Sequence, residues 1–140
     1  MKNFVIVLTL IVSSFTIESI AQNQANMNTF DSNFVHTVYF WLHNPDSQAD
    51  CQKFEASLSK FLQSSEFAKT KFIGKPPKAS RDVVDGSFTY SLVVTFESAQ
   101  AQQAYQDEAP HKLFIEEASH LWKKVIVYDS IEIPDSKMRN

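Results

Sequence analysis

The chain has 140 residues, a formal net charge of −3 at pH 7 and 44% hydrophobic residues, which suits one domain with one core. The mild acidic balance and the lack of a basic block argue against nucleic acid or an anionic membrane surface as partner. Cys51 is the one cysteine, so the chain forms no intrachain disulfide and depends on its core or on a partner subunit for stability.

Residues 1–21 have the pattern of a secretory signal peptide. Lys2 supplies a positive start, residues 4–12 are almost continuously apolar, and Ser19 and Ala21 are small residues at the −3 and −1 positions of a cleavage site. A transmembrane anchor is the alternative, but it needs roughly 20 continuous apolar residues, and polar residues interrupt this run from position 13. We therefore expect a protein exported to the periplasm or the extracellular space, with no membrane segment in its mature form.

A domain is predicted at residues 34–131, between a flexible linker at 22–33 that is rich in Asn and Gln and a polar tail at 132–140. The domain begins with a strand at 34–42, FVHTVYFWL, which is β-branched and aromatic. Its even positions fall on one face and its odd positions on the other, and both faces are apolar enough to be buried.

A helix follows this strand. Ser47 and Asp50 have the spacing of a capping pair, and the apolar stripe steps by three and four residues through Cys51, Phe54, Leu58, Phe61 and Leu62. A short strand is expected at 69–74, a loop at 78–86 and a clearly alternating strand at 87–96.

Two further helices are expected, one from Ser98 to about Asp107 and one that Pro110 opens, with a buried stripe that reaches Leu121 and Trp122. A last strand covers 125–130. The order βαββααβ predicts a ferredoxin-like α+β domain with a four-stranded antiparallel sheet.

The predicted helices can cover one face of the sheet and leave the other bare. Tyr39, Trp41 and Val93 make that second face too apolar for water, which is typical of an interface. We expect a homodimer in which two sheets pack face to face and form an α/β barrel.

Several separated motifs arrive in a recognisable order from residue 34 to 131: FVHTVYF, then DGSFTYSLVVTFES, then AYQDEAPHKLF and VIVYDS. In this order they resemble the stress-responsive A/B-barrel (Dabb) family. The resemblance implies the same dimeric α/β barrel, with one helix-covered cavity in each subunit. It does not define a function, because this fold carries many different ones.

The resemblance also implies a candidate site. Tyr105 and His111 match, by position and six-residue spacing, the Tyr and His that a plant cyclase of the family uses in an aldol-type ring closure. His36 matches a pocket His on the first strand. The chain departs from the cyclase at Tyr90, where the cyclase has a second strand His, and at Leu58, where it has a pocket Tyr.

Two functions remain open from the sequence. In one, the cavity binds a small, largely apolar molecule, with His36, Tyr90, Val38, Phe40 and Leu58 in its wall. In the other, the protein catalyses cyclase- or lyase-like carbonyl chemistry, with His111 as base and Tyr105 as its partner. Structural roles stay open for both histidines, as a satisfied core residue for His36 and as a residue fixing the helix junction for His111.

No metal or other cofactor is expected. Glu116 and His120 have helical i to i+4 spacing, but a metal site needs a third and a fourth ligand, which the sequence does not offer. No residue is singled out as an axial ligand for haem.

The first prediction is export with cleavage after Ala21. N-terminal sequencing of the protein from its native host should begin Gln22-Asn23-Gln24, because the small residues Ser19 and Ala21 direct the cut there. A mature protein that still begins with Met1 would contradict export.

Overall fold

The computed structural model of the chain describes residues 33–133. The predicted signal peptide, the linker up to residue 32 and the tail from residue 134 lie outside the described residues. No helix within residues 33–133 is both long enough and apolar enough to span a bilayer.

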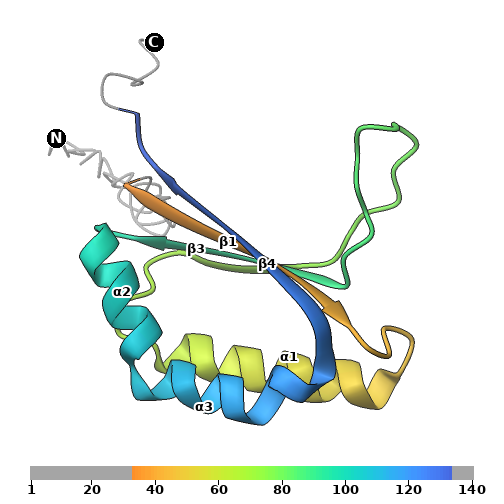
Figure 1. Cartoon of the computed structure of the whole chain (residues 1–140), viewed down its shortest axis with the longest axis horizontal. Helices are drawn as coiled ribbons and strands as arrows, with labels where there is room; N and C mark the ends of the chain where they lie inside the picture. The colour runs from red at the N-terminus through yellow and green to blue at the C-terminus, as the bar shows by residue number, and fades with distance from the viewer. Residues whose placement is uncertain (1–32, 134–140) are drawn as a thin grey trace, which may run out of the picture.

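The described chain is an α+β domain with the predicted order of elements (Figure 1). Its elements are β1 (Phe34–Leu42), α1 (Gln48–Ser64), β2 (Lys71–Gly74), β3 (Tyr90–Phe96), α2 (Ala99–Asp107), α3 (Ala109–Ala118), the 3-10 helix η2 (Ser119–Leu121) and β4 (Trp122–Ile131).

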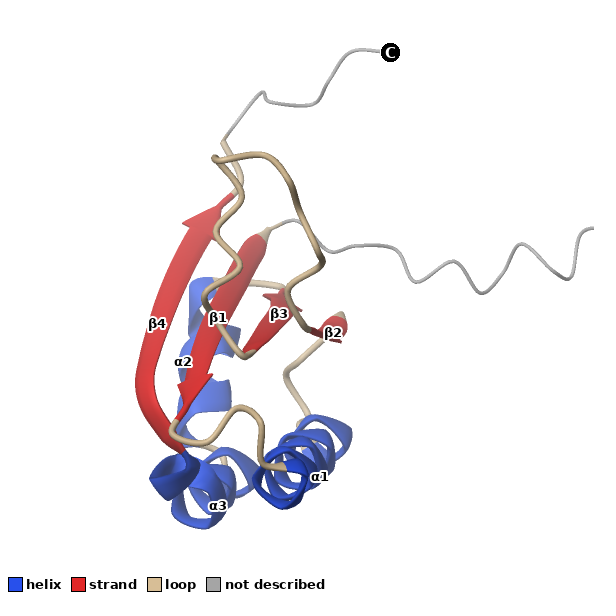
Figure 2. Cartoon of the chain, turned by 90° about the vertical axis from the view of Figure 1, so that its right-hand side faces the viewer, coloured by secondary structure: helices blue, strands red, loops and turns tan. Residues whose placement is uncertain are grey.

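The four strands form one antiparallel sheet in the order β2-β3-β1-β4. The helices lie on one side of it, and the other side carries no helix (Figures 1 and 2). β1 lies between β3 and β4, with Val38 opposite Leu92 on one side and opposite Val127 on the other. The fold is therefore the predicted ferredoxin-like arrangement.

The core lies between the sheet and the helices. Even-numbered residues of β1 are buried and odd-numbered ones are half-buried, because successive side chains of a strand point to opposite faces. Aromatic rings fill much of the core: Phe54 packs against Phe40, Tyr90, Phe114 and Trp122, with ring centroids 4.8 to 6.1 Å apart. Aromatic pairs at these distances stabilise a core beyond the area that they bury.

Side-chain contacts fix where the helices begin and how they pack. The Ser47 hydroxyl accepts a hydrogen bond from the Asp50 amide at the start of α1, and Ser98 does the same for Ala101 in α2. Between α1 and α3, the Glu117 carboxylate accepts hydrogen bonds of 2.8 Å from both Ser57 and Lys60. These bonds hold α1 and α3 side by side under the sheet.

The starts of three strands differ from the expected ones. β2 begins at Lys71 rather than at residue 69. β3 begins at Tyr90, because residues 87–89 leave the ladder for the preceding loop, although the Thr89 amide still donates to the Phe40 carbonyl at 2.8 Å. β4 begins at Trp122, which we expected at the end of the helix. The helix ends at Ala118 and η2 turns the chain, so Trp122 reaches the core from the strand.

An irregularity in the pairing of β1 with β4 sets the orientation of β4. Trp41 pairs with Lys124 and Leu42 pairs with Trp122, so Lys123 is an extra residue in β4. The bulge brings Trp122 opposite the buried Leu42, and Val125 opposite the buried Phe40. An even-numbered and an odd-numbered residue of β4 thus lie on the same, helix-covered side of the sheet.

The side of the sheet without helices is apolar, as the sequence predicts. Tyr39 packs against Phe88 at 4.8 Å between ring centroids and against Tyr128 at 6.2 Å. Phe72 and Tyr128 are 56% and 59% exposed, and the Lys124 ammonium lies over the Trp41 ring. An exposed aromatic surface of this kind is typical of an interface.

Candidate functional site

A cavity of about 180 Å³ lies between the helix-covered side of β1 and β4 and the helices α2 and α3. Its wall is mostly apolar and aromatic, with a few polar groups. The lining residues are His36, Val38, Phe40, Phe61, Leu92, Tyr105, Gln106, His111, Phe114, Ile115, Trp122, Val125 and Val127. Such a wall is typical of sites for small organic ligands.

The structure brings five of the seven candidate residues of the sequence to this cavity. His36, Val38 and Phe40 reach it from β1, Tyr105 from α2, and His111 from the first turn of α3. Three of these rings follow one another: the centroids of His36 and Tyr105 are 5.9 Å apart, and those of Tyr105 and His111 are 5.4 Å apart. One small ligand could contact all three rings.

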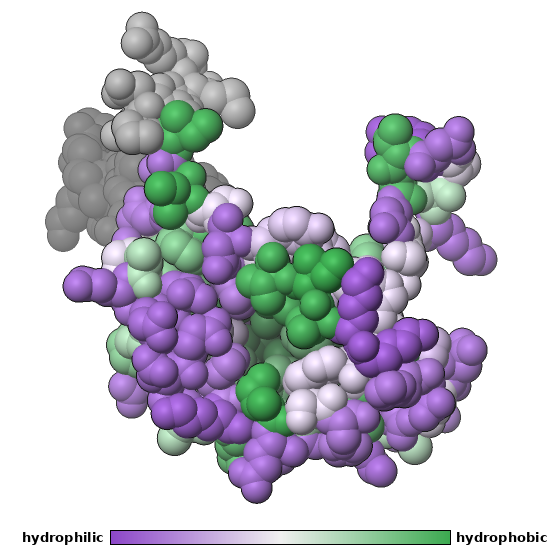
Figure 3. Space-filling view, viewed as in Figure 1, coloured by the Kyte–Doolittle hydropathy of each residue, from purple (hydrophilic) through white to green (hydrophobic). Residues whose placement is uncertain are grey.

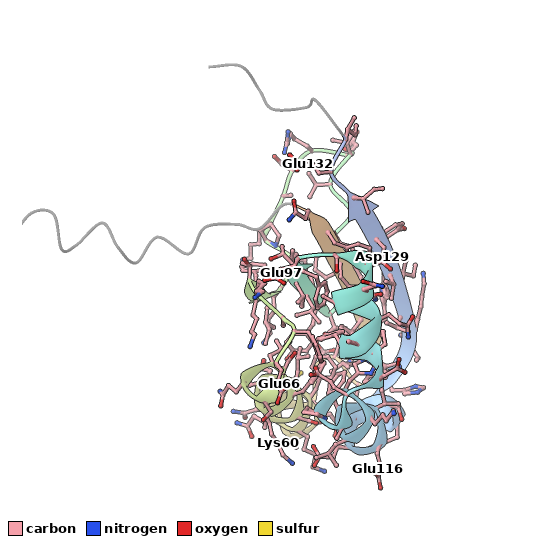
Figure 4. The ribbon with its side chains drawn as sticks, turned by 90° about the vertical axis from the view of Figure 1, so that its left-hand side faces the viewer. Lys60, Glu66, Glu97, Glu116, Asp129 and Glu132 are labelled. Carbon is pink, nitrogen blue, oxygen red and sulfur yellow. The ribbon has the colours of Figure 1, made fainter. Side chains whose placement is uncertain are left out.

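His36 is buried and hydrogen-bonded to a carboxylate. Its Nδ1 lies 2.6 Å from Oδ1 of Asp129, on the neighbouring strand β4; Figure 4 shows Asp129 on β4 beside α2. Because a carboxylate only accepts hydrogen bonds, Nδ1 carries a proton, and Nε2 is the ring nitrogen left for another partner. Asp129 therefore fixes the orientation of the His36 ring.

Tyr105 is a hydrogen-bond donor at this site. Burial raises the pKa of its hydroxyl well above the usual value, and the nearby Glu108 carboxylate acts in the same direction. Tyr105 therefore stays protonated at neutral pH and can donate to an oxygen of a bound molecule.

His111 is half-buried, and its pKa is lowered. Burial is the largest cause, because it disfavours the charged imidazolium, and the nearby His36 lowers the pKa further. A hydrogen bond with the Gln106 backbone and the charge of Asp107 act in the opposite sense. His111 is therefore neutral at neutral pH, which is the form that a general base needs.

The cavity opens at the edge strand of the sheet. Ile115 on α3 and Val125 and Val127 on β4 line it and are also 40%, 43% and 46% exposed. Figure 3 shows apolar surface over β4 with a hollow between β4 and α3. The cavity is therefore open to solvent along this edge.

Tyr90 and Leu58 lie outside the lining of this cavity. Tyr90 faces the helices, but its hydroxyl donates to Oε1 of Glu55 at 2.6 Å, and Lys75 binds the same oxygen at 2.9 Å. Burial and the bond to Glu55 raise the pKa of Tyr90, so it stays a protonated donor to that carboxylate. Leu58 is fully buried in the core beneath the sheet.

Asp129, behind His36, and several residues of the cavity wall were not among the candidates from the sequence. Asp129 is 93 positions from His36, and no motif links the two. Phe61, Phe114 and Trp122 were recognised as core residues, and the core stripe of a helix does not indicate which of its members border a cavity. The described part of the chain has no group of three His, Cys, Asp or Glu side chains that could hold a metal ion.

The lowered pKa of His111 makes stability depend on pH. The unfolded chain protonates this imidazole near its ordinary pKa of about 6.5, whereas the folded protein resists protonation until lower pH. The folding free energy that neutral His111 contributes is thus fully present above pH 6.5 and is lost as the pH falls. His111→Gln should flatten this loss, as measured by urea unfolding between pH 5 and pH 8.

Replacement of the exposed His120 is the matched control, because it makes the same chemical change at a residue outside the cavity wall. His120→Gln should leave the dependence of unfolding free energy on pH close to that of the natural protein. Equal slopes for the natural protein and His111→Gln would contradict a depressed pKa at His111.

Solved structures with the same arrangement include three useful neighbours. Hydroxynitrile lyase from Passiflora edulis is 21% identical, with a TM-score of 0.62, over 74% of this chain and 96% of its own. A Dabb family protein with a ferredoxin-like fold from Mesorhizobium loti is 17% identical, with a TM-score of 0.60, over 71% and 96% of the two chains.

A dimeric ferredoxin-like protein of unknown function from Thermobifida fusca is 15% identical, with a TM-score of 0.57, over 71% of this chain and 90% of its own. At these identities the likeness shows a shared fold. A search of curated protein sequences gave no match. The family model of the Stress responsive A/B Barrel Domain, Dabb, matches residues 34–132, which is most of the chain. The chain therefore belongs to the Dabb family of stress-responsive A/B-barrel domains.

Proposed function

We propose that this protein binds a small, largely apolar molecule that carries a hydrogen-bonding oxygen, in the cavity between β1, β4, α2 and α3. The observation that carries the proposal is the combination of an apolar, aromatic wall with His36, Tyr105 and His111 at one cavity. An apolar body would displace water from the wall, and an oxygen would accept the hydrogen bond of Tyr105.

The size of the cavity limits the ligand. Pockets for drug-sized molecules hold roughly 300–1,000 Å³, and this one holds about 180 Å³. A single substituted ring or a short chain fits that volume. A longer tail would have to extend through the mouth, where Ile115, Val125 and Val127 provide apolar surface.

Ligand size and polarity can be tested with acetophenone and ethylbenzene, two probes of similar shape of which one has a carbonyl. Both should bind, and acetophenone should bind more tightly, because it can accept a hydrogen bond from Tyr105. Isothermal titration and ligand-detected NMR measure the two affinities. Tyr105→Phe should bring the two affinities together.

Blocking the mouth provides the matched control. Ile115→Trp should weaken binding about tenfold or more, because the larger ring fills the entrance beside β4. Leu113→Trp, on the same helix and 39% exposed but outside the cavity wall, should leave binding unchanged. Equal binding by all three proteins would place the ligand elsewhere.

We propose that the protein works as a homodimer built on the side of the sheet without helices, and as an exported protein. Exposed aromatic residues on that side support the dimer, and so does the description of the Thermobifida fusca neighbour as dimeric. The pattern at residues 1–21 supports export.

A dimer on this side of the sheet predicts twice the chain mass in light scattering at micromolar concentration. Trp41→Asp should shift the protein toward monomer, because the interface would bury a carboxylate without a partner. Leu113→Asp makes the same kind of change on the helix side and should stay dimeric. A monomeric natural protein would exclude the dimer.

Lyase- or cyclase-like carbonyl chemistry is a second candidate. It is supported by the protonation states of the neighbouring Tyr105 and His111, a protonated hydroxyl beside a neutral imidazole. A neutral His111 can take the hydroxyl proton of a hydroxynitrile while the carbon–cyanide bond breaks and the oxygen becomes a carbonyl. Cyanide leaves with the bonding electrons, and the proton passes from His111 to it. The hydrogen bond of Tyr105 would stabilise the negative charge on the oxygen.

Mandelonitrile tests this second candidate, because its cleavage releases benzaldehyde, which is followed by absorbance. If the protein is a lyase, His111→Ala should lower the rate by about 10²-fold or more and leave benzaldehyde binding within a few fold. His120→Ala, at an exposed position, is the control and should keep full activity. A natural protein with no rate above buffer would leave ligand binding as the better proposal.

A further inference from the structure

The connection between β2 and β3 is about 15 residues long and runs from Lys75 to Thr89 without helix or strand of its own. We name residues 75–89 the β2–β3 arm. It rises from the end of the sheet on the side opposite to α1 and α3 (Figures 1 and 2). Long loops without secondary structure are uncommon in compact domains and are often functional.

Specific contacts tie the base of the arm to β1. The Trp41 indole donates to the Ser87 hydroxyl at 3.3 Å, and the Leu42 amide donates to the Thr89 hydroxyl at 3.0 Å. Phe88 packs edge-on against Tyr39, on the side of the sheet without helices. The arm is therefore joined directly to the apolar surface of the sheet.

Contacts within the arm also hold its shape. The Val84 amide donates to the Arg81 carbonyl at 3.0 Å, and the Ser87 amide donates to the Asp85 carboxylate at 2.8 Å. Gly86 lies so close to the other leg that a Cβ there would be 3.4 Å from Cβ of Pro76. The two legs of the arm are thus in contact, and the arm has a defined conformation.

Val83, near the tip of this arm, is 87% exposed. Its aliphatic side chain is thus left in solvent by the domain itself, although the arm that carries it has a defined shape. In Figure 3 the arm stands at one end of the molecule and the last described residues of β4 stand at the other. Between these two projections lies the side of the sheet that carries Tyr39, Trp41, Phe72 and Tyr128.

We infer that the β2–β3 arm packs against a second copy of this chain and places Val83 on the partner's surface. The inference rests on the proposed homodimer, because a copy stacked on the apolar side of the sheet would lie beside the arm. The base of the arm continues the apolar side of the sheet through the Phe88–Tyr39 contact, and Val83 lies near its tip among mostly polar residues. The arm then enlarges the interface and gives Val83 a buried environment.

Photocross-linking tests this contact. A benzoylphenylalanine in place of Val83, in protein purified from cells expressing the full chain, should give on irradiation a covalent species of twice the chain mass. Glu116, which lies on the helix layer (Figure 4), is the control position and should give none. Cross-linking at both positions to the same degree would indicate random collision and overturn the inference.

Sedimentation of Val83→Asp provides an independent measurement. Because Val83 is exposed within the domain, the change should not disturb folding, and it should raise the dissociation constant of the dimer by about tenfold or more. Val83→Ile, which keeps an aliphatic side chain, should leave that constant within a few fold.

The outcomes distinguish a failure of the proposed arm contact from a failure of the proposed dimer. A natural protein that sediments as a monomer would overturn both the proposed dimer and the arm contact. A dimer that gives no cross-link from position 83, or whose dissociation constant Val83→Asp leaves unchanged, would overturn the arm contact alone.

Discussion

The structure depends on one constraint: three helices can cover only one side of a four-stranded sheet. β1 runs through the middle of this sheet with apolar residues on both faces. The even-numbered side chains of β1 are sealed beneath the helices, where Phe40 and Phe54 pack. The odd-numbered ones, Tyr39 and Trp41 among them, lie on the bare side. One strand therefore faces the cavity on one side of the sheet and an exposed aromatic surface on the other.

The polar groups of the cavity are accommodated in different ways. His36 has Asp129 as a partner within the fold, which removes the cost of burying one of its ring nitrogens. Outside the cavity wall, Glu55 accepts the hydrogen bond of the Tyr90 hydroxyl and is itself paired with Lys75. Burial keeps the Tyr105 hydroxyl protonated, so it can donate a hydrogen bond to an oxygen of a molecule in the cavity.

Alternation and helical spacing were enough to predict the order of the elements and the buried face of β1, since both patterns are local. The position of a side chain along the sheet cannot be predicted in the same way. Tyr90 and Leu58 were assigned to the helix-covered side, where they lie, but nothing in the sequence shows that Tyr90 pairs with Glu55 outside the cavity wall. Asp129 could not be found either, because its contact with His36 follows from the register of β1 with β4, which is set by long-range packing.

Lys123, the extra residue in β4, has a consequence for how this protein can change over generations. Trp122 before it and Val125 after it lie on the same side of the sheet, and after it the odd-numbered Val127 and Asp129 face the cavity and His36. Point substitutions in β4 could alter the ligand through its odd positions and the bare side through its even ones, independently. Loss of Lys123 would leave both sets in place, because Leu42 would still lie opposite Trp122 and Trp41 opposite Lys124. Loss of one residue further along β4 would instead exchange the two sets for the rest of the strand. Chain length can therefore vary at the bulge, whereas it is tightly restrained along the rest of β4.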